Sequence, residues 1–237
     1  MSSKHEFITH LFEEFTRITE VLSEGFVPNY HGEDLRLDTN PKDVMYMGIP
    51  MVSFADIEAQ TILDHINRVG KDYGSYAISM KKEWALRQKW LNPVWYVTDE
   101  ATLMHLHRNW KAVMETGISG FMKKYKSPWI DEDFHNYAER EWRYTVPITE
   151  VKWILTQEAY DKWRKDPNEK RPAPTEELIN HALKFDIGDI DSIIVPDKTY
   201  TDEISNFLHT TETFSGQKRK LSEGEINFLL GLVTTIK

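Results

Sequence analysis

The sequence has 237 residues, a formal net charge of -9 and no cysteine. A chain of this length can bury a core large enough to fold without a covalent staple, and the missing thiols exclude disulfides, zinc–thiolate sites and cysteine nucleophiles. Because affinity for phosphate backbones comes largely from clustered Lys and Arg, the acidic balance argues against nonspecific binding to nucleic acid and favours a basic partner or a neutral small molecule.

The sequence has no pattern typical of export or membrane insertion. Its first segment, MSSKHEFITH, lacks a basic region followed by an apolar run, and no stretch approaches the roughly 20 apolar residues that a spanning helix needs. We therefore expect a cytoplasmic protein with no membrane partner. The P-loop, the Rossmann glycine pattern, HExxH and GxSxG are also absent, which leaves kinases, dehydrogenases, zincins and α/β-hydrolases with little support.

The first half of the chain alternates short apolar strands with helical patterns. Apolar runs and alternation predict strands over residues 7–12, 49–54, 76–80 and 93–97. Apolar residues at helical spacing predict helices over residues 15–24, 59–69 and 103–121, with Gly117 and Gly120 weakening the last turns of the third. Between the first helix and the second strand, Pro, Gly, Asp and Asn interrupt any period over residues 27–43, so a loop is expected there.

The second half adds two strands and a terminal helix. Alternation predicts a strand over residues 139–146, and an apolar run predicts another over residues 190–195. Residues 165–175 are dense in proline and charge, which indicates a surface linker between two short helices. A polar run over residues 210–220 precedes an amphipathic helix, for which Ser222 and Glu225 form a capping box.

This order of elements predicts an α+β fold. We expect a single domain with a mixed, mostly antiparallel sheet flanked by helices. Residues 1–209 would form this domain, and residues 210–237 would form a polar tether and a C-terminal amphipathic helix that packs on the same domain, because terminal helices usually dock locally.

The segment Glu139 to Arg143 is the strongest candidate for a site. Strand alternation places Glu139, Glu141, Arg143 and Thr145 on one face, and a strand that presents carboxylates and a guanidinium beside aromatic residues can orient and polarise a small charged ligand. The alternative is an exposed sheet face on which Glu141 and Arg143 only pair with each other or with solvent.

Three further residues are candidates for binding a ligand. His10 ends the first strand, where it can reach a cleft between sheet and helix or serve as an ordinary structural hydrogen-bonding group. Tyr73 and Tyr76 flank the entrance of the third strand, where a ring can stack on a planar base and a hydroxyl can bind its amide. Tyrosines in this position are equally ordinary in a core.

Acidic residues in the middle of the chain suggest a remote alternative. Asp131, Glu132 and Asp133, with His135 and the pair Glu150 and Lys152, have the residue types of a magnesium-dependent nuclease. Their spacing is loose and common, so we expect no bound metal.

Six blocks of sequence carry a resemblance to a known family. In order they are ITHLFEEFTRITEVLSEGF, IPMVSFADI, YGSYAISMKKEWA, NPVWYV, EREWRY and IDSIIVPD, and they span residues 8–197. Together they resemble the AbiGi family of abortive-infection proteins. The resemblance implies phage defence by growth arrest or death, in which the chain is a non-catalytic antitoxin or binding module that neutralises a nucleotidyltransferase-like toxin or binds another defence protein.

The same blocks resemble, more distantly, the ADP-ribosyltransferases of the DarT type. That resemblance implies an ADP-ribosyltransferase-like fold that binds NAD and modifies a macromolecular target. Glu141 would then be catalytic and stabilise the ribosyl cation, His10 would bind the nicotinamide-side ribose, and Tyr76 would help form the nicotinamide pocket. Tyr73 is a further candidate for binding NAD. Arg143 would hold a phosphate or orient Glu141, and Arg36 and Arg68 are the candidates for the arginine that such enzymes use to hold phosphate.

Overall fold

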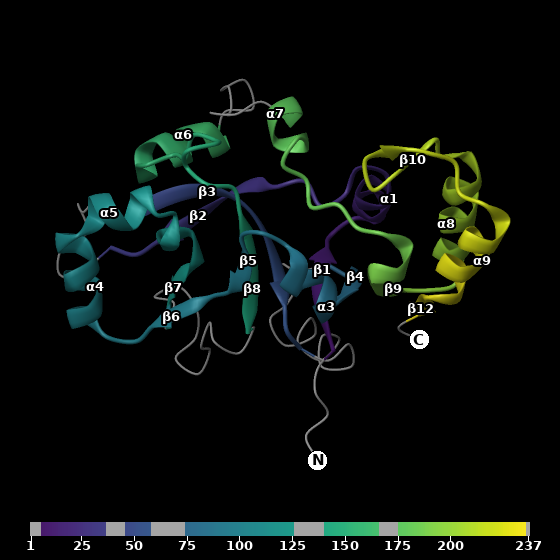
Figure 1. Cartoon of the computed structure of the whole chain (residues 1–237), viewed down its shortest axis with the longest axis horizontal. Helices are drawn as coiled ribbons and strands as arrows, with labels where there is room; N and C mark the ends of the chain where they lie inside the picture. Colours follow the sequence, from purple (N-terminus) through teal and green to yellow (C-terminus); the bar gives the residue numbers. More distant parts are fainter. Residues whose placement is uncertain (1–5, 37–45, 58–73, 126–139, 166–174, 236–237) are drawn as a thin grey trace, which may run out of the picture. The chain divides into compact units, whose positions relative to one another are not determined.

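The computed structural model describes residues 6–36, 46–57, 74–125, 140–165 and 175–235 (Figure 1). The chain divides into two compact units, each assembled from separate segments. The first unit comprises Met1–Val27, Phe54–Lys89 and Ala182–Lys237, and the second comprises Pro28–Ser53 and Trp90–His181. The helix expected over residues 59–69 lies outside the described residues, as does the linker expected over residues 165–175 except for its two end residues, which belong to helices. The single domain expected over residues 1–209 stays a prediction.

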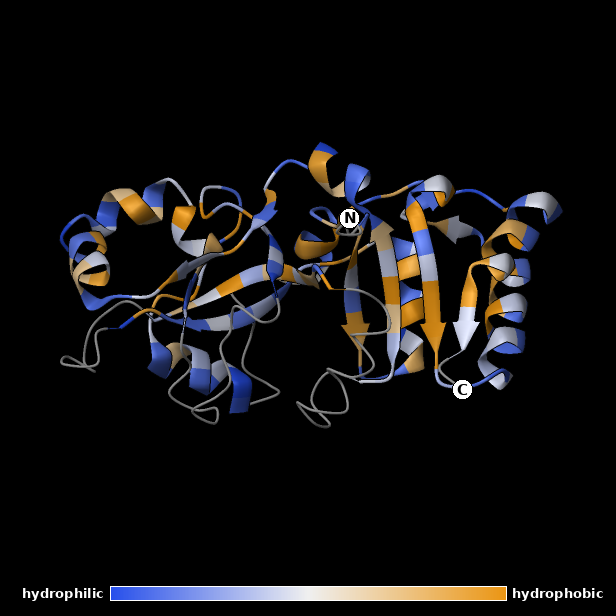
Figure 2. Cartoon of the chain, turned by 90° about the horizontal axis from the view of Figure 1, so that it is seen from below, coloured by the Kyte–Doolittle hydropathy of each residue, from blue (hydrophilic) through white to orange (hydrophobic). Residues whose placement is uncertain are grey.

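The first unit contains a sheet in the order β12-β9-β4-β1, whose strands Figure 2 shows side by side. β1 pairs antiparallel with β4, from Phe7↔Lys81 to Phe12↔Tyr76. β9 also pairs antiparallel with β4, and β12 pairs parallel with β9. The strands are β1 (Phe7–Phe12), β4 (Tyr76–Lys81), β9 (Ile190–Val195) and β12 (Val233–Thr235), and β10 (Thr213–Phe214) and β11 (Gln217–Lys218) form a separate hairpin. The helices are α1 (Phe15–Glu24), α3 (Lys82–Arg87), the 3-10 helix η3 (Ile187–Asp189), α8 (Thr199–Thr210) and α9 (Glu223–Gly231).

The second unit contains most of β3, which pairs with β2 and is the neighbour of β8, and β8 pairs in turn with β5. The strands of this sheet are β2 (Asn29–Asp34), β3 (Tyr46–Ala55), β5 (Leu91–Pro93) and β8 (Glu141–Thr145), and β6 (Trp95–Val97) and β7 (Met122–Lys124) form a parallel pair of their own. The helices are α4 (Glu100–Arg108), α5 (Trp110–Glu115), the 3-10 helix η1 (Ile118–Phe121), α6 (Gln157–Lys165) and α7 (Thr175–Ile179).

These elements confirm an α+β fold with a mixed, mostly antiparallel sheet. The strands predicted at 7–12 and 190–195 have the expected bounds, because both are apolar runs with clear breaks at each end. No helix among the described residues is both long and apolar enough to cross a membrane.

Three expectations for the second unit were wrong. Residues 29–34, expected in a loop, form β2. The sequence NYHGED has no apolar alternation typical of a strand, and the segment is extended because it pairs with β3. The strand expected at 93–97 divides at Val94, since Pro93 cannot donate a ladder hydrogen bond, and its halves join different sheets. The helix over residues 103–121 was expected to be long but able to break in its weak last turns at Gly117 and Gly120. It breaks earlier, at Asn109, and β7 begins directly after the last 3-10 turn.

Helix α1 is capped by parts of the chain that are far away in sequence. The last four carbonyls of a helix have no partner within the helix. Here those of Val21, Leu22, Ser23 and Glu24 accept hydrogen bonds from Gly25 N, Ser215 N, Gly216 N and the Lys184 ammonium, respectively. The positive charge of Lys184 also lies at the helix end where the macrodipole favours a cation.

The cap comes from the segment that was expected to be a polar tether. Thr213–Phe214 and Gln217–Lys218 instead form a hairpin whose two loop residues both have positive φ, 49° at Ser215 and 73° at Gly216. Such a turn matches the twist of a two-residue hairpin. Ser215 is buried, and its hydroxyl accepts a hydrogen bond from Phe185 N at 2.7 Å. The segment is therefore a packed part of the first unit.

Helix α9 follows this hairpin and begins as its sequence predicts. The Ser222 hydroxyl accepts from Glu225 N at 3.3 Å, and the Glu225 carboxylate accepts from Ser222 N at 2.8 Å, which completes the capping box. Ile226 and Leu229 are buried, and the helix contacts α8.

Replacing Gly216 with Ala should destabilise the first unit. A Cβ at this position would lie 2.0 Å from the Lys184 ammonium nitrogen, and a residue other than glycine is strained at this φ by about 1–2 kcal/mol. We expect a loss of about that size in urea unfolding followed by circular dichroism. Gly224→Ala is the matched control, because Gly224 lies in α9 of the same unit with open space around it. Equal stability of the two variants would contradict the capping role.

Candidate functional site

The residues predicted from sequence to form one site fall in two groups. Glu141 and Arg143 lie on β8 in the second unit. His10 lies on β1 and Tyr76 on β4, both in the first unit. Tyr73 is outside the described residues. The structure therefore brings Glu141 together with Arg143 and places His10 and Tyr76 in a different compact unit.

Strand β8 is buried along its whole length, so the alternative of an exposed charged face was wrong. Glu141 is 6% exposed and Arg143 1% exposed. Glu33 of β2 and Lys123 of β7 contact the face that carries Glu141 and Arg143, and Trp142 and Tyr144 on the other face are also buried. We call Glu33, Ser53, Lys123, Glu141 and Arg143 the Arg143 network.

All five N–H donors of the Arg143 guanidinium have acceptors. Nε donates to Glu141 Oε1 at 2.6 Å, and Nη2 donates to Glu141 Oε2 at 3.1 Å and to Glu33 Oε1 at 2.5 Å. Nη1 donates to the carbonyls of Gly120 and Met122, each at 3.3 Å. An arginine has five donors and no acceptor, so this side chain has no hydrogen-bonding capacity left for a ligand phosphate.

The carboxylate of Glu141 is equally occupied. Its Oε1 accepts from Arg143 and from the Ser53 hydroxyl at 2.7 Å, and its Oε2 accepts from Arg143 and from the Lys123 ammonium at 3.0 Å. A carboxylate offers about four acceptor positions, and four donors already surround this one. A catalytic role would require at least one of these bonds to open.

The network contains two carboxylates and two cations, so its charges balance within the protein. Burial opposes the charged form of Glu141, but Arg143 and Lys123 outweigh this and lower its pKa. Burial has the larger effect on Glu33 and raises its pKa, although Arg143 opposes the shift. Arg143 has a raised pKa, because Glu141 and Glu33 outweigh its burial. A buried group of this kind is stable only while every member is paired.

Sequence reasoning missed Glu33, Ser53 and Lys123. Glu33 lies on β2, which was expected to be a loop, and Lys123 lies on β7, just past the helix expected over residues 103–121, where no strand was predicted. Ser53 lies within an expected strand but carried no chemical pattern. The local alternation of β8 identified Glu141 and Arg143, whereas their partners are 18 to 110 residues away in sequence.

Arg36, a candidate for holding phosphate, is also engaged in protein contacts. Its guanidinium donates to both oxygens of Asp34, at 2.8 and 2.5 Å, and to the Gln157 side chain at 2.6 Å. It also lies over the ring of Tyr46, 5.4 Å from its centroid. The arginine therefore joins the end of β2 to α6. Arg68, the other candidate, is outside the described residues.

His10 belongs to an aromatic cluster of the first unit. Its ring centroid is 4.6 Å from that of Phe12 and 5.6 Å from those of Phe26 and Phe54. The contacts with Phe12 and Phe26 are edge-to-face and that with Phe54 is tilted, and such contacts at these distances are typical of packing in a core. The two roles weighed for His10, in ligand binding and in structural hydrogen bonding, both stay predictions.

Tyr76 makes its contacts with other aromatic side chains of the first unit. Its ring is 5.1 Å from that of Tyr200 and 6.1 Å from that of Phe15. Burial, followed by the hydrogen bond to Tyr200, raises the pKa of Tyr76. The hydroxyl therefore stays protonated and serves as a partner of Tyr200.

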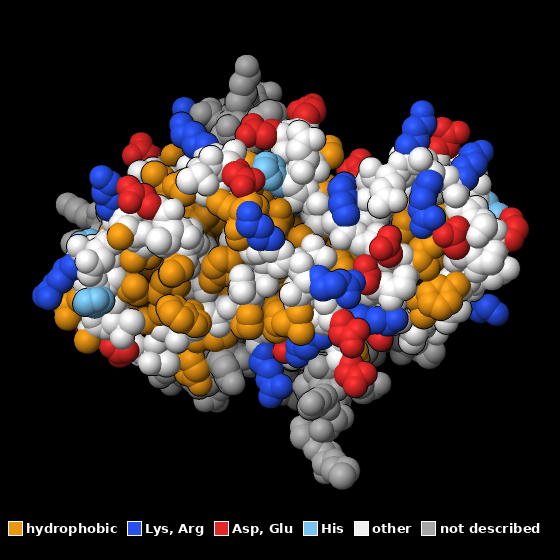
Figure 3. All heavy atoms as spheres, viewed as in Figure 1, with side chains coloured by type: hydrophobic (Ala, Val, Ile, Leu, Met, Phe, Trp, Pro, Cys, Tyr) orange, Lys and Arg blue, Asp and Glu red, His pale blue; other side chains and the backbone are white. Residues whose placement is uncertain are grey.

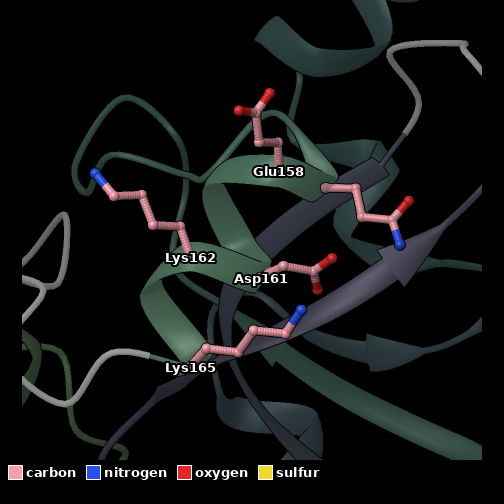
Figure 4. Close-up of a pocket in the computed structure, with 5 residues that line it drawn as sticks. Glu158, Asp161, Lys162 and Lys165 are labelled. Atoms are coloured by element: carbon pink, nitrogen blue, oxygen red, sulfur yellow. The ribbon is translucent and has the colours of Figure 1, made fainter.

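Two hollows lie on the described part of the second unit. Glu141, Arg143, His10, Tyr76 and Arg36 line neither of them, whereas Glu150 and Lys152, from the nuclease alternative, line one. One, of about 690 Å³, contains Ile148, Leu155 and Trp163 together with Glu150 and Lys152. The other, of about 580 Å³, follows a single helix, α6, where Glu158, Asp161, Lys162 and Lys165 project from successive turns (Figure 4). Alternating charges on one helix are typical of a solvated surface.

No group of three or more His, Asp or Glu side chains in the described part of the chain is placed to hold a metal ion. Asp131, Glu132, Asp133 and His135 lie outside it. The magnesium-dependent nuclease therefore stays an untested alternative that rests on sequence alone.

The fold and the network define an α+β protein whose buried charged cluster is satisfied by its own side chains. The family described as abortive phage resistance protein AbiGi, antitoxin, matches the chain over residues 24–120. This match confirms the resemblance to the AbiGi family. The matched segment contains Glu33 and Ser53 and ends before β7 and β8. No curated protein and no solved structure matches the chain significantly, and the likeness to DarT-type transferases stays a prediction.

Replacing Arg143 with Lys should unfold the second unit more readily. A lysine has three donors on one nitrogen, so it cannot bridge Glu33, Glu141 and two carbonyls together. Removing one partner from a buried ion pair costs about 3–5 kcal/mol, and we expect a loss approaching this in urea unfolding. Arg164→Lys, at an exposed position of α6 in the same unit, is the matched control. If both variants are equally stable, the network does not support the unit.

Proposed function

We propose that this chain is the antitoxin-type component of an abortive-infection system and acts by binding and neutralising a toxin protein. The match of residues 24–120 to a family described as an antitoxin carries this proposal. The Arg143 network supports the proposal, because its hydrogen-bond donors and acceptors are already paired within the protein. Such a network can stabilise the conformation of a binding surface. The activity would then depend on an interface with another protein.

Co-expression with the product of the adjacent gene tests this function. The neighbouring product should inhibit growth when expressed alone, and growth should recover when this chain is expressed with it. The two proteins should also co-purify as a complex at a fixed ratio. A neighbouring toxin that stays fully toxic and does not bind the chain would sink the proposal.

A second candidate function rests on the ionised state of Glu141. Arg143 and Lys123 keep this buried carboxylate charged, and a fixed negative charge can stabilise the cation that forms when nicotinamide leaves NAD. In this reading His10, Tyr73, Tyr76 and Arg143 bind NAD, and Glu141 is the catalytic residue of an ADP-ribosyltransferase that modifies a macromolecular target. The four hydrogen bonds to Glu141 favour the antitoxin over this candidate.

NAD titration separates the two candidates. The antitoxin function predicts no heat of NAD binding in calorimetry and no transfer of label from labelled NAD to protein or nucleic acid. The transferase predicts binding that weakens in His10→Ala and label transfer that disappears in Glu141→Gln. Circular dichroism of both variants provides the control for folding. Label transfer by the intact protein would overturn the assignment of a purely binding role.

A further inference from the structure

Strand β6 is fixed in place on both sides of Trp95. Val94 N donates to the carbonyl of Glu141 at 2.8 Å, and Glu141 N donates to the hydroxyl of Tyr96 at 2.8 Å. In addition, Trp95 pairs with Met122 of β7 in the two-stranded parallel sheet. The Arg143 network lies directly behind this strand, because Lys123, the next residue of β7, forms an ion pair with Glu141. The backbone that carries Trp95 is therefore held by the backbone of Glu141, whose side chain belongs to the Arg143 network.

The indole of Trp95 nevertheless lies in solvent. It is 65% exposed, whereas Trp84, Trp142 and Trp153 are between 1% and 8% exposed. Met104 of α4 and Ile118 of η1, in the same unit, are also more than 40% exposed. Figure 3 shows hydrophobic side chains on the visible surface over α4, α5 and the β6–β7 pair. Exposed apolar surface of this kind often marks an interaction site.

A rigidly held tryptophan is well suited to protein recognition. Tryptophan is among the residues that contribute most to binding energy at interfaces, because it buries a large area at a small cost in conformational entropy. A strand fixed at Val94, Tyr96 and Met122 lowers that cost further, since the backbone is ordered before binding. The three properties of size, exposure and a fixed backbone occur together at Trp95.

The charges beside Trp95 indicate the chemistry of the partner. Arg140 is exposed and directly precedes Glu141, whose backbone is hydrogen-bonded to Val94 and to the Tyr96 hydroxyl on either side of Trp95, and Lys124 of β7 pairs with Val97 of β6. Lys123 is neutralised by Glu141, so the basic side chains beside β6 that can face a partner are those of Lys124 and Arg140. This local surface is basic although the whole chain is acidic, so it is complementary to carboxylates.

We infer that Trp95 is the anchor by which this chain binds its toxin, with the indole inserted into an apolar pocket of the toxin that is bordered by carboxylates. The inference rests on the proposed antitoxin function and names the surface that performs it. The matched segment, residues 24–120, includes Trp95. The Arg143 network then has a positioning role, since it orders the strand that presents the anchor.

The test measures the affinity of the purified full-length chain for the purified product of the adjacent gene. Trp95→Ala should weaken binding about 30-fold or more, as expected for a central interface residue. Trp95→Phe should retain part of the affinity, and Arg140→Glu should weaken binding most at low salt. Leu86→Ala is the matched control, because Leu86 is 71% exposed and lies in the first unit. It should bind as tightly as the intact protein.

A double-mutant cycle tests the positioning role. Tyr96→Phe removes the acceptor of Glu141 N, and it should weaken binding when Trp95 is present and have little further effect in Trp95→Ala. A purely structural role of Tyr96 would give the same loss in both backgrounds. Melting curves for each variant identify any loss that comes from unfolding.

The outcomes separate the inference from the function on which it rests. If the intact chain does not bind the toxin, the proposed function fails and the inference fails with it. If the intact chain binds and folded Trp95→Ala binds equally well, the antitoxin function stands and the anchor is overturned. Selective loss in Trp95→Ala, with Leu86→Ala unchanged, supports the anchor.

Discussion

The second unit depends on the pairing of one buried guanidinium. Removing a charge from water costs several kcal/mol even after the protein relaxes. Arg143 can therefore be buried only where carboxylates and carbonyls of the protein replace its interactions with water. The donors of its planar fork reach Glu33 on β2, Glu141 on β8 and two carbonyls that precede or begin β7. A single side chain thus connects three strands that come from different parts of the sequence. Geometry of this kind specifies one arrangement, because a displaced strand would leave an unpaired charge.

The same pairing determines how the functional candidates are weighed. A catalytic carboxylate needs room for its substrate, and a phosphate-binding arginine needs free donors. Glu141 and Arg143 have neither in this structure, although their residue types and their alternation on a strand fit both roles. Residue chemistry alone therefore cannot distinguish a reaction centre from a structural ion network. The two are distinguished by whether the hydrogen-bond donors and acceptors are free for a substrate or already occupied by protein groups.

The local parts of the fold followed from sequence, and the long-range parts did not. β1, α1, β9 and the capping box at Ser222 depend on neighbouring residues, so periodicity and capping rules predicted them. β2 depends on its pairing with β3, and the hairpin at Ser215 is ordered by α1, about 190 residues earlier. Glu141 and Arg143 were identified as a pair because they are two residues apart on one strand. Lys123 and Glu33 were missed because only the folded chain brings them close.

The capping of α1 also bears on the order in which this protein assembles during synthesis. The helix leaves the ribosome well before Lys184, Ser215 and Gly216, whose groups satisfy three of its last four carbonyls. Isolated helices of ten residues are marginal in water. We therefore expect α1 to become stable only after Lys184, Ser215 and Gly216 have been synthesised. The second unit, whose segments end at His181, has all its residues before then. The order of synthesis therefore favours formation of the Arg143 network first. The first unit can fold completely only after its last segment, Ala182–Lys237, has been synthesised.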